Sequence, residues 1–181
     1  SVIAEATPAI WATDPDTGKQ YLEELPRLLR GALAEMRTLL IELRPSALGE
    51  QTLGQLLELL ADSARARSGT TITLQVEGDY PLSNSVILIF YRIAQESLNN
   101  IAKHAEATEV NMWLNSDGED VSLQITDDGR GFDPTNIPPG HLGIGIMHER
   151  AREIGAAIQI DSNPGDGTLI RVTWSIKDQT L

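Results

Sequence analysis

A stretch near the middle of the chain combines helix-forming residues with a polar stripe. It runs from Gln95 to Ala105 and has the sequence QESLNNIAKHA. Residues three and four apart are neighbours on a helix, so we expect Glu96, Asn100 and Lys103 on one face. A carboxylate, an amide oxygen and an ammonium on one stripe suit a metal ion and phosphates, because Mg²⁺ takes oxygen ligands and usually only one or two from protein. Taken alone, the stripe is more simply explained as a solvated helix face.

A second segment follows an alternating apolar pattern. Val121, Leu123 and Ile125 alternate with polar residues, which predicts a half-buried strand. The strand is followed by the sequence DDGRG at residues 127–131, in which Asp-Gly indicates a turn. A carboxylate at a strand end can accept a hydrogen bond from the exocyclic amine of a bound base, and glycines let the backbone approach a ligand closely. An ordinary Asp-Gly hairpin turn is the alternative.

A third segment places Gly143 and Gly145 before an amphipathic run that predicts a helix at about 145–154. Backbone N–H groups at the start of a helix form an anion site. The spacing does not fit the Gly-x-Gly-x-x-Gly dinucleotide fingerprint, and the chain has no Walker-type Gly-Lys-Ser/Thr sequence. Phosphates that bind here therefore bind in a fold other than the two commonest nucleotide folds.

In this order, the three segments resemble the N, G1 and G2 boxes of the histidine kinase ATP-binding domain, whose fold is shared with gyrase, Hsp90 and MutL. They resemble in particular the sensor kinases that include the nitrate sensors and the DesK-like and LiaS-like kinases. Glu96 to His104 is similar to their Glu-x-x-x-Asn-x-x-Lys-His helix, and Gly143 to Arg150 to their second glycine box. The sequence PGDGT at residues 164–168 resembles the turn that closes the family's site, and 43–48 the junction between helical bundle and catalytic domain.

The resemblance implies roles for the polar residues of the first two segments. Asn100 would coordinate Mg²⁺ through its side-chain oxygen, and Glu96 would hold a metal-bound water or act as a base. Lys103 and His104 would neutralise phosphate oxygens of ATP. Asp127 would accept a hydrogen bond from the adenine amine.

It also implies roles for the glycines and for one threonine. Gly129 and Gly131 would let the base and a lid pack closely, while Gly143 and Gly145 would offer backbone N–H groups to the phosphates. Thr168 would lie near the adenine end of the nucleotide. Positioning and charge neutralisation dominate phosphoryl transfer, so such a site needs little covalent help from protein.

Composition agrees with this assignment and excludes some other classes. The 181 residues exceed the usual size of a single domain, and the absence of Cys excludes disulfides and thiol chemistry and favours a reducing compartment. The net charge of −12 argues against binding of nucleic acid. No apolar run approaches the ~20 residues needed to cross a bilayer, and the start carries no basic leader. We therefore expect no direct membrane contact by this segment and a cytoplasmic location, which allows a membrane anchor elsewhere in the full-length protein.

The chain divides near Pro45. Leucines repeat at helical period from about Lys19 to Arg44, and a turn at 14–18 separates this helix from an apolar stub at 2–10. One helix and a stub cannot bury such a stripe, so we expect a second copy and a homodimer through the N-terminal helices. Packing of the stripe onto the chain's own C-terminal domain is the alternative. Residues 1–46 are expected to form part of a dimerisation bundle, and residues 47–181 the catalytic ATP-binding domain.

The second half predicts an α+β two-layer sandwich of the gyrase/Hsp90/histidine kinase/MutL type, preceded by the long dimerisation helix. Sequential antiparallel strands are expected, with helices laid on one face. The segment 133–142 contains three prolines and predicts a mobile lid. The expected elements are helices at 51–67, 83–104 and 145–154, and strands at 70–77, 108–115, 120–127, 157–162 and 167–176.

The resemblance implies the ATP-binding catalytic part of a two-component sensor histidine kinase. Such an enzyme transfers the γ-phosphoryl group to a His on its first bundle helix, and then to an Asp of a response regulator receiver domain. None of His104, His141 and His148 resembles that acceptor, so we expect a fragment that lacks it and does not autophosphorylate by itself. The alternatives are an anti-sigma-type serine kinase, a stand-alone ATPase that uses Glu96 as its base, and a non-catalytic dimerisation module.

Overall fold

The computed structural model describes residues 51–78, 81–117, 119–134 and 143–175, together with Lys19 and Met36, which are both helical and exposed. The expected stub and most of the N-terminal helix lie outside the described residues. So do the domain boundary at residues 46 and 47, His141, and all of the expected lid beyond Pro134. The predictions for these segments remain predictions.

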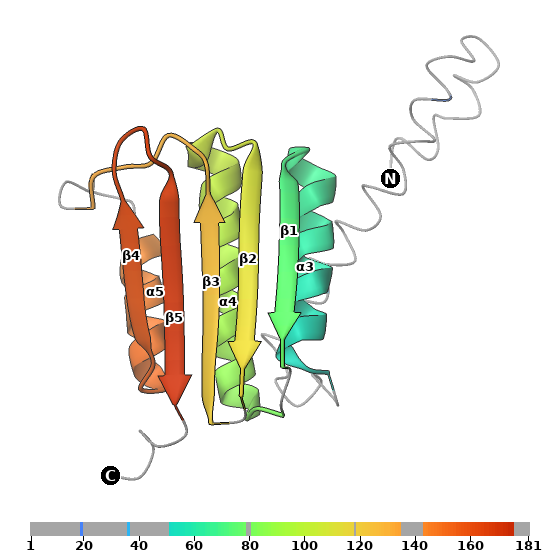
Figure 1. Ribbon diagram of the computed structural model, residues 1–181, viewed down its shortest axis with the longest axis vertical. Coiled ribbons are helices and arrows are strands. Elements are labelled where there is room, and N and C mark those ends of the chain that lie inside the picture. Colours follow the sequence, from blue (N-terminus) through green and yellow to red (C-terminus); the bar gives the residue numbers. More distant parts are fainter. Residues whose placement is uncertain are drawn as a thin grey trace.

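The described residues form a sheet with helices on one of its faces (Figure 1). The five strands have the order β1-β2-β3-β5-β4. The predicted α+β two-layer sandwich is confirmed. The strands are β1 (Thr71–Glu77), β2 (Glu109–Ser116), β3 (Asp120–Asp127), β4 (Ala157–Ser162) and β5 (Thr168–Ser175), and the helices are α3 (Leu53–Ser68), α4 (Asn84–Asn100) and α5 (Gly143–Glu153).

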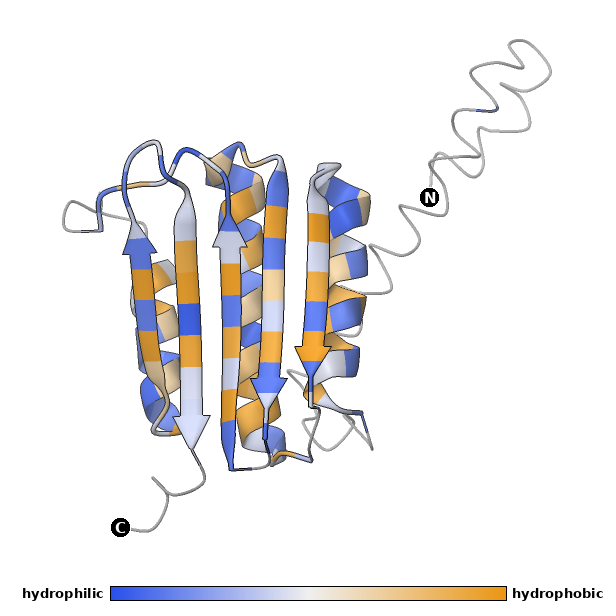
Figure 2. Cartoon of the chain, in the orientation of Figure 1, coloured by the Kyte–Doolittle hydropathy of each residue, from blue (hydrophilic) through white to orange (hydrophobic). Residues whose placement is uncertain are grey.

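Alternation of side chains explains why the sheet is covered on one face only. Hydrophobic and hydrophilic residues alternate along the strands in Figure 2, and in β3 the alternate residues Val121, Leu123 and Ile125 are buried. Successive side chains of a strand point to opposite faces, so these residues turn toward the helices while Ser122 and Gln124 turn away. The core therefore fills the space between the sheet and the helices.

α4 is the central helix of this core and carries the polar stripe at its C-terminal end. Ser83 caps its N-terminus, since the side-chain oxygen accepts the N–H of Val86. Phe90 and Ile93 are fully buried, and each such side chain contributes about 1.5–3 kcal/mol relative to exposure. The buried face fixes the rotation of α4 and thus the direction of its remaining polar residues.

The C-terminal extension of α4 differs from the expected regular helix. The predicted helix over 83–104 ends as α helix at Asn100, and Ile101–Ala105 form a π-helical turn, η2. Glu106 then stops the helix in the left-handed region, with φ of 55°. Hydrogen bonds in a π turn span one more residue than in an α helix, so residues beyond Asn100 no longer keep the angular spacing of the α-helical stripe.

The strand directions correct one expectation. β1 and β2 are parallel, with Thr71 opposite Glu109, whereas the neighbouring pairs β2–β3, β3–β5 and β4–β5 are antiparallel. The expectation of sequential antiparallel strands is therefore wrong for the first pair. The reason is the connection: α4 carries the chain back along the sheet, as a crossover between parallel strands requires. The remaining hairpins, β2–β3 and β4–β5, are as expected.

Candidate nucleotide-binding site

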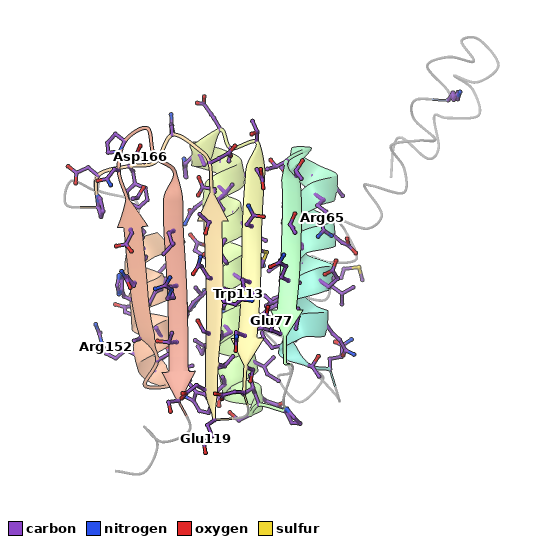
Figure 3. All side chains as sticks on the ribbon, in the orientation of Figure 1. Arg65, Glu77, Trp113, Glu119, Arg152 and Asp166 are labelled. Atoms are coloured by element: carbon purple, nitrogen blue, oxygen red, sulfur yellow. The ribbon has the colours of Figure 1, made fainter. Side chains whose placement is uncertain are left out.

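Several segments that are distant in sequence meet at the edge of the sheet where β3 ends (Figure 1). They are the C-terminal end of α4 with η2, the end of β3, the start of α5 and the turn between β4 and β5. Figure 3 places Asp166, which lies in that turn, at this edge and Glu119 at the opposite end of the sheet. The three segments predicted to form the site, at 95–105, at 127–131 and at the start of α5, therefore meet at one edge of the sheet.

Glu96 and Asn100 lie against the start of α5. A Cβ built on Gly143 would lie 2.2 Å from Oε1 of Glu96 and 3.3 Å from Nδ2 of Asn100. The absence of a side chain at Gly143 thus lets the first turn of α5 approach both groups. The buried Met147 supports this contact, because its Sδ lies 3.7 Å from the Ser97 hydroxyl on α4. The helix N-terminus is a favourable place for negative charge.

Lys103, the third member of the predicted stripe, lies in the π turn beyond the α-helical part of α4. Lys103 and His104 lie on η2 and are exposed. Lys103 lines a groove of about 530 Å³ that is also bordered by Arg67 of α3 and Ile72 of β1. Glu96 and Asn100 therefore share the face toward the start of α5, and the place of Lys103 on that face remains a prediction. The proposed phosphate contacts of Lys103 and His104 remain predictions.

Asp127 is the last residue of β3 and is 5% exposed. Its Oδ1 accepts the N–H of Gly129 at 2.9 Å, and Thr168 is its cross-strand partner on β5. Burial raises the pKa of Asp127 above the ordinary 3.8, and hydrogen bonding from Gly129 and the neighbouring Thr168 opposes the rise. Asp127 and Thr168 were predicted to lie at the adenine end of one site, and the structure brings them together. A buried carboxylate with few partners is suited to accept a further donor.

Gly129 and Gly131 are required by the packing of the protein itself. A Cβ on Gly129 would lie 2.5 Å from the backbone oxygen of Ala105, and one on Gly131 would lie 2.0 Å from that of Asn163. Gly131 also has φ of +58°, which disfavours a side chain. The loop after β3 is thus held against η2 on one side and the β4–β5 turn on the other. Room for a base or lid, the role predicted for these glycines, remains a prediction.

Gly145 differs from Gly143. Both glycines lie within the first turn of α5, which begins at Gly143 and not at about residue 145 as expected. Nothing lies within 4 Å of a Cβ built on Gly145, so its position leaves open space. Such space is compatible with the predicted approach of phosphates to the backbone, which remains a prediction.

Asp128 is a positioning residue that sequence reasoning missed. Its carboxylate accepts hydrogen bonds from the Thr108 N–H at 2.8 Å, the Thr108 hydroxyl at 2.5 Å and the Glu109 N–H at 2.9 Å. The bond from the Thr108 hydroxyl is the largest cause of a lowered pKa of Asp128. Asp128 thereby ties the end of β3 to the start of β2. The doubled Asp before Gly129 was the available signal, but the resemblance assigned a role to Asp127 alone and none to Asp128.

The oxygen atoms at this edge fit a hard cation better than a transition metal. Within the described ranges, no three His, Cys, Asp or Glu side chains come together as a metal-binding group. The amide of Asn100 and the carboxylate of Glu96 both lie against Gly143. Mg²⁺ commonly takes one or two protein oxygens and completes its shell with water and phosphate, so this small donor set is compatible with it.

The sequence is similar to those of several bacterial sensor kinases. It is 33% identical over 178 residues to an uncharacterised sensor-like histidine kinase of Chloroflexus aurantiacus, with 93% of this chain and 30% of the relative covered. It is 34% identical to the sensor histidine kinase LiaS of Bacillus subtilis, over 76% of this chain and 38% of LiaS. Identity to the sensor protein VraS of Staphylococcus saprophyticus is 31%, over 84% and 44%. The chain thus spans less than half the length of these relatives.

Solved structures and a family match identify the fold and the family. The histidine kinase domain of the Erythrobacter litoralis EL346 blue-light activated histidine kinase aligns with a TM-score of 0.62 at 20% identity, covering 84% of this chain and 76% of that one. Acinetobacter baumannii histidine kinase AdeS aligns with a TM-score of 0.57 at 13% identity, over 97% and 94%. Residues 85–178, more than half of the chain, match the histidine kinase-, DNA gyrase B-, and HSP90-like ATPase family. The chain belongs to this family of ATP-binding domains.

Proposed function

We propose that this chain is the ATP-binding catalytic part of a two-component sensor histidine kinase. In the whole protein, the γ-phosphoryl group of ATP passes to a histidine of the dimerisation helices and then to an aspartate of a response regulator. The main support is the arrangement at one edge of the sheet, where the start of α5 lies against Glu96 and Asn100 and Asp127 lies beside Thr168. The names of the relatives support the same class of enzyme.

The chemistry of the site follows from its residues. Asn100 and Glu96 hold Mg²⁺, directly or through water, and the ion neutralises charge on the phosphates when bound. Asp127 accepts the adenine amine, and the backbone at Gly143 and Gly145 donates to phosphate oxygens. Lys103 and His104 sit on the exposed π turn, from which their side chains reach toward the phosphates. The transfer itself depends on positioning and on charge neutralisation.

The proposed partners are a second copy of the chain and a receiver domain. Dimerisation would proceed through the N-terminal helices, whose leucine stripe needs a partner. The net charge of −12 disfavours nucleic acid as a ligand. Among the described residues, no helix is long and apolar enough to cross a membrane. We place the domain in the cytoplasm, where ATP and response regulators are present.

Titration calorimetry with ATP, with and without Mg²⁺, tests the metal assignment. Asn100→Ala should weaken MgATP binding by about tenfold or more, because a charge-assisted ligand contact is lost. The variant should bind ATP equally in Mg²⁺ and in EDTA. Asn115→Ala removes the same side chain from the end of β2 farther from the site and should leave both affinities unchanged. Wild-type affinity and Mg²⁺ dependence in Asn100→Ala would refute the assignment.

Labelling of the full-length protein with γ-labelled ATP tests the reaction. A histidine kinase should give protein-bound phosphate that is stable in alkali and lost in acid. Glu96→Gln should lower the labelling rate while nucleotide binding persists. Steady release of inorganic phosphate without protein-bound label would instead favour a stand-alone ATPase.

A further inference from the structure

A groove lies between the C-terminal end of α3 and the π turn η2. α3 leads into β1 and η2 leads into β2, and these strands are parallel neighbours, so the two helix ends lie side by side (Figure 1). The segments that enter the strands are joined, because the Thr71 N–H donates to the Thr108 oxygen at 3.1 Å and the Thr70 hydroxyl to the Ala107 oxygen at 3.4 Å. Hydrogen bonds between the two segments thus hold the backbone at this end of the groove.

The lining of the groove is largely aliphatic. It includes four buried branched side chains, one from each neighbouring element: Ile72 of β1, Leu98 of α4, Ile101 of η2 and Val110 of β2. Among the described residues that line the groove, none carries an aromatic ring. Its volume of about 530 Å³ lies within the range of about 300–1,000 Å³ that is typical of small-molecule sites. The lining therefore suits a short aliphatic chain.

The charged residues of the groove give it a positive balance. Arg67 of α3 and Lys103 of η2 line it from different elements. The chain has 14 Lys and Arg against 26 Asp and Glu, so two basic residues at one groove stand out in an acidic protein. Of the described residues in the lining, only Glu106 is acidic, and its Oε1 lies 3.5 Å from Nη1 of Arg130, which partly offsets its charge.

We propose that this groove binds a small aliphatic carboxylate, with the chain against the aliphatic lining and the carboxylate at Arg67. A guanidinium presents paired N–H donors that match the two oxygens of a carboxylate. Lys103 adds positive charge from the opposite element. This site goes beyond the proposed function and does not depend on it. Lys103 is also placed at the ATP phosphates under that function, so the test is built on Arg67.

Three probes with the same chain and different head groups test the charge preference: octanoate, octanol and octylammonium. Their Kd values are measured from backbone amide shifts in NMR titrations, which also locate the site. Octanoate should bind about two- to fivefold more tightly than octanol, because the guanidinium of Arg67 is exposed and solvent weakens its ion pair. Octylammonium should bind more weakly than octanol. The shifts should concentrate at residues 64–72 and 98–110.

Arg67→Ala should weaken octanoate binding about two- to fivefold and leave octanol binding unchanged. A basic residue in the last turn of a helix also stabilises the helix itself, so a matched control is needed. Arg152 occupies the last turn of α5 as Arg67 occupies that of α3, and Figure 3 places it on the other side of the molecule from Arg65 of α3. Arg152→Ala should leave the Kd values of all three probes unchanged. Equal weakening in the two variants would overturn the inference.

A second pair of variants tests the space in the groove. Ala102 is exposed and lines the groove, so Ala102→Phe should weaken octanoate and octanol alike. Ala157 is an exposed alanine at the start of β4, outside the lining, and Ala157→Phe should change neither Kd. Ala102→Leu fills less space and supplies the same test if the phenylalanine variant does not fold. Octanoate that binds no more tightly than octanol, or that shifts amides outside the groove, would overturn the inference, as would the absence of binding.

Discussion

The two hairpins of the sheet have the same topology but are held in different ways. The turn between β2 and β3 relies on neighbours: Asp117 donates its N–H to the Asp120 oxygen at 3.2 Å, and its carboxylate accepts the N–H groups of Glu119 and Asp120. The turn between β4 and β5 has a local hydrogen bond, from the Asp166 N–H to the Asn163 oxygen at 3.1 Å, and adds a distant one. Its Gly165 N–H donates to the Arg130 oxygen at 2.7 Å. Figure 1 places these turns at opposite ends of the sheet.

The difference indicates where a sequence change will reach the candidate site. A turn closed by its own residues can vary without moving its surroundings. The β4–β5 turn contacts the loop after β3, and that loop contacts η2 through the Arg130 N–H and the Ala105 oxygen, 2.8 Å apart. Changes in this turn are therefore expected to alter both stability and nucleotide binding. Three predictions test this contrast, in order of decreasing effect.

The largest effect is expected for Gly167→Ala. A Cβ at Gly167 would lie 2.0 Å from the Asp127 backbone oxygen, and φ is +74°. The free energy of unfolding should fall by more than about 2 kcal/mol, because backbone strain adds to a clash with backbone. Gly165→Ala in the same turn is the control, since φ is +94° but nothing lies within 4 Å of its Cβ. There the loss should be about 1–2 kcal/mol from strain alone. Equal losses in urea denaturation would contradict the packing argument.

Asp127→Asn should have opposite effects on binding and on stability. ATP affinity should fall about ten- to a hundredfold, since a hydrogen bond to a charged group is weakened. The pKa of Asp127 is raised in the folded state, chiefly by burial, from 3.8. A raised pKa contributes stability below 3.8 that is lost as pH rises through the folded pKa. The variant should therefore gain stability relative to wild type between about pH 4 and pH 7. Thermal unfolding across this range measures the difference in stability between variant and wild type. A difference that does not change with pH would contradict a raised pKa of Asp127.

The smallest effects are expected for two aspartates whose carboxylates accept hydrogen bonds from backbone N–H groups. Asp128→Ala removes hydrogen bonds to Thr108 and Glu109, so it should lower the melting temperature more than Asp117→Ala, whose bonds are local. Because the pKa of Asp128 is lowered, its stabilisation is present above 3.8 and disappears as pH falls through the folded pKa. The melting temperatures of wild type and Asp128→Ala should thus converge in acid. Asp117→Ala should cost at most about 1 kcal/mol and leave ATP binding unchanged.

Much of the fold could be predicted from patterns along the chain. The alternation in β3 and the turn residues at 164–167 predict the strands and hairpins because they reflect local geometry. Alternation says nothing about strand direction, so the parallel pairing of β1 and β2 was missed. The signal for it was present in the helix α4 that joins the two strands. No pattern in the sequence predicted the π turn, in which Lys103 and His104 lie.

The candidate site could be predicted where its polar residues occur in unusual combinations along the sequence. Glu96, Asn100 and Asp127 stand out because polar groups interrupt apolar patterns. The contacts of Ser162 could not be predicted in this way, since a serine at the end of a strand is common. Its hydroxyl accepts the Phe132 N–H and donates to the Gly167 oxygen. Such contacts depend on the register of β4 with β5 and require the tertiary structure to be known.

The central claim is that the residues gathered at one edge of the sheet bind a single magnesium nucleotide. Backbone amide shifts in NMR spectra, recorded while MgATP is added, test it most directly. We predict that the shifts concentrate at residues 96–105, 127–132, 143–147 and 163–168, while the turn at 117–120 stays unchanged. Shifts spread evenly over the sheet, or strongest at 117–120, would contradict the account.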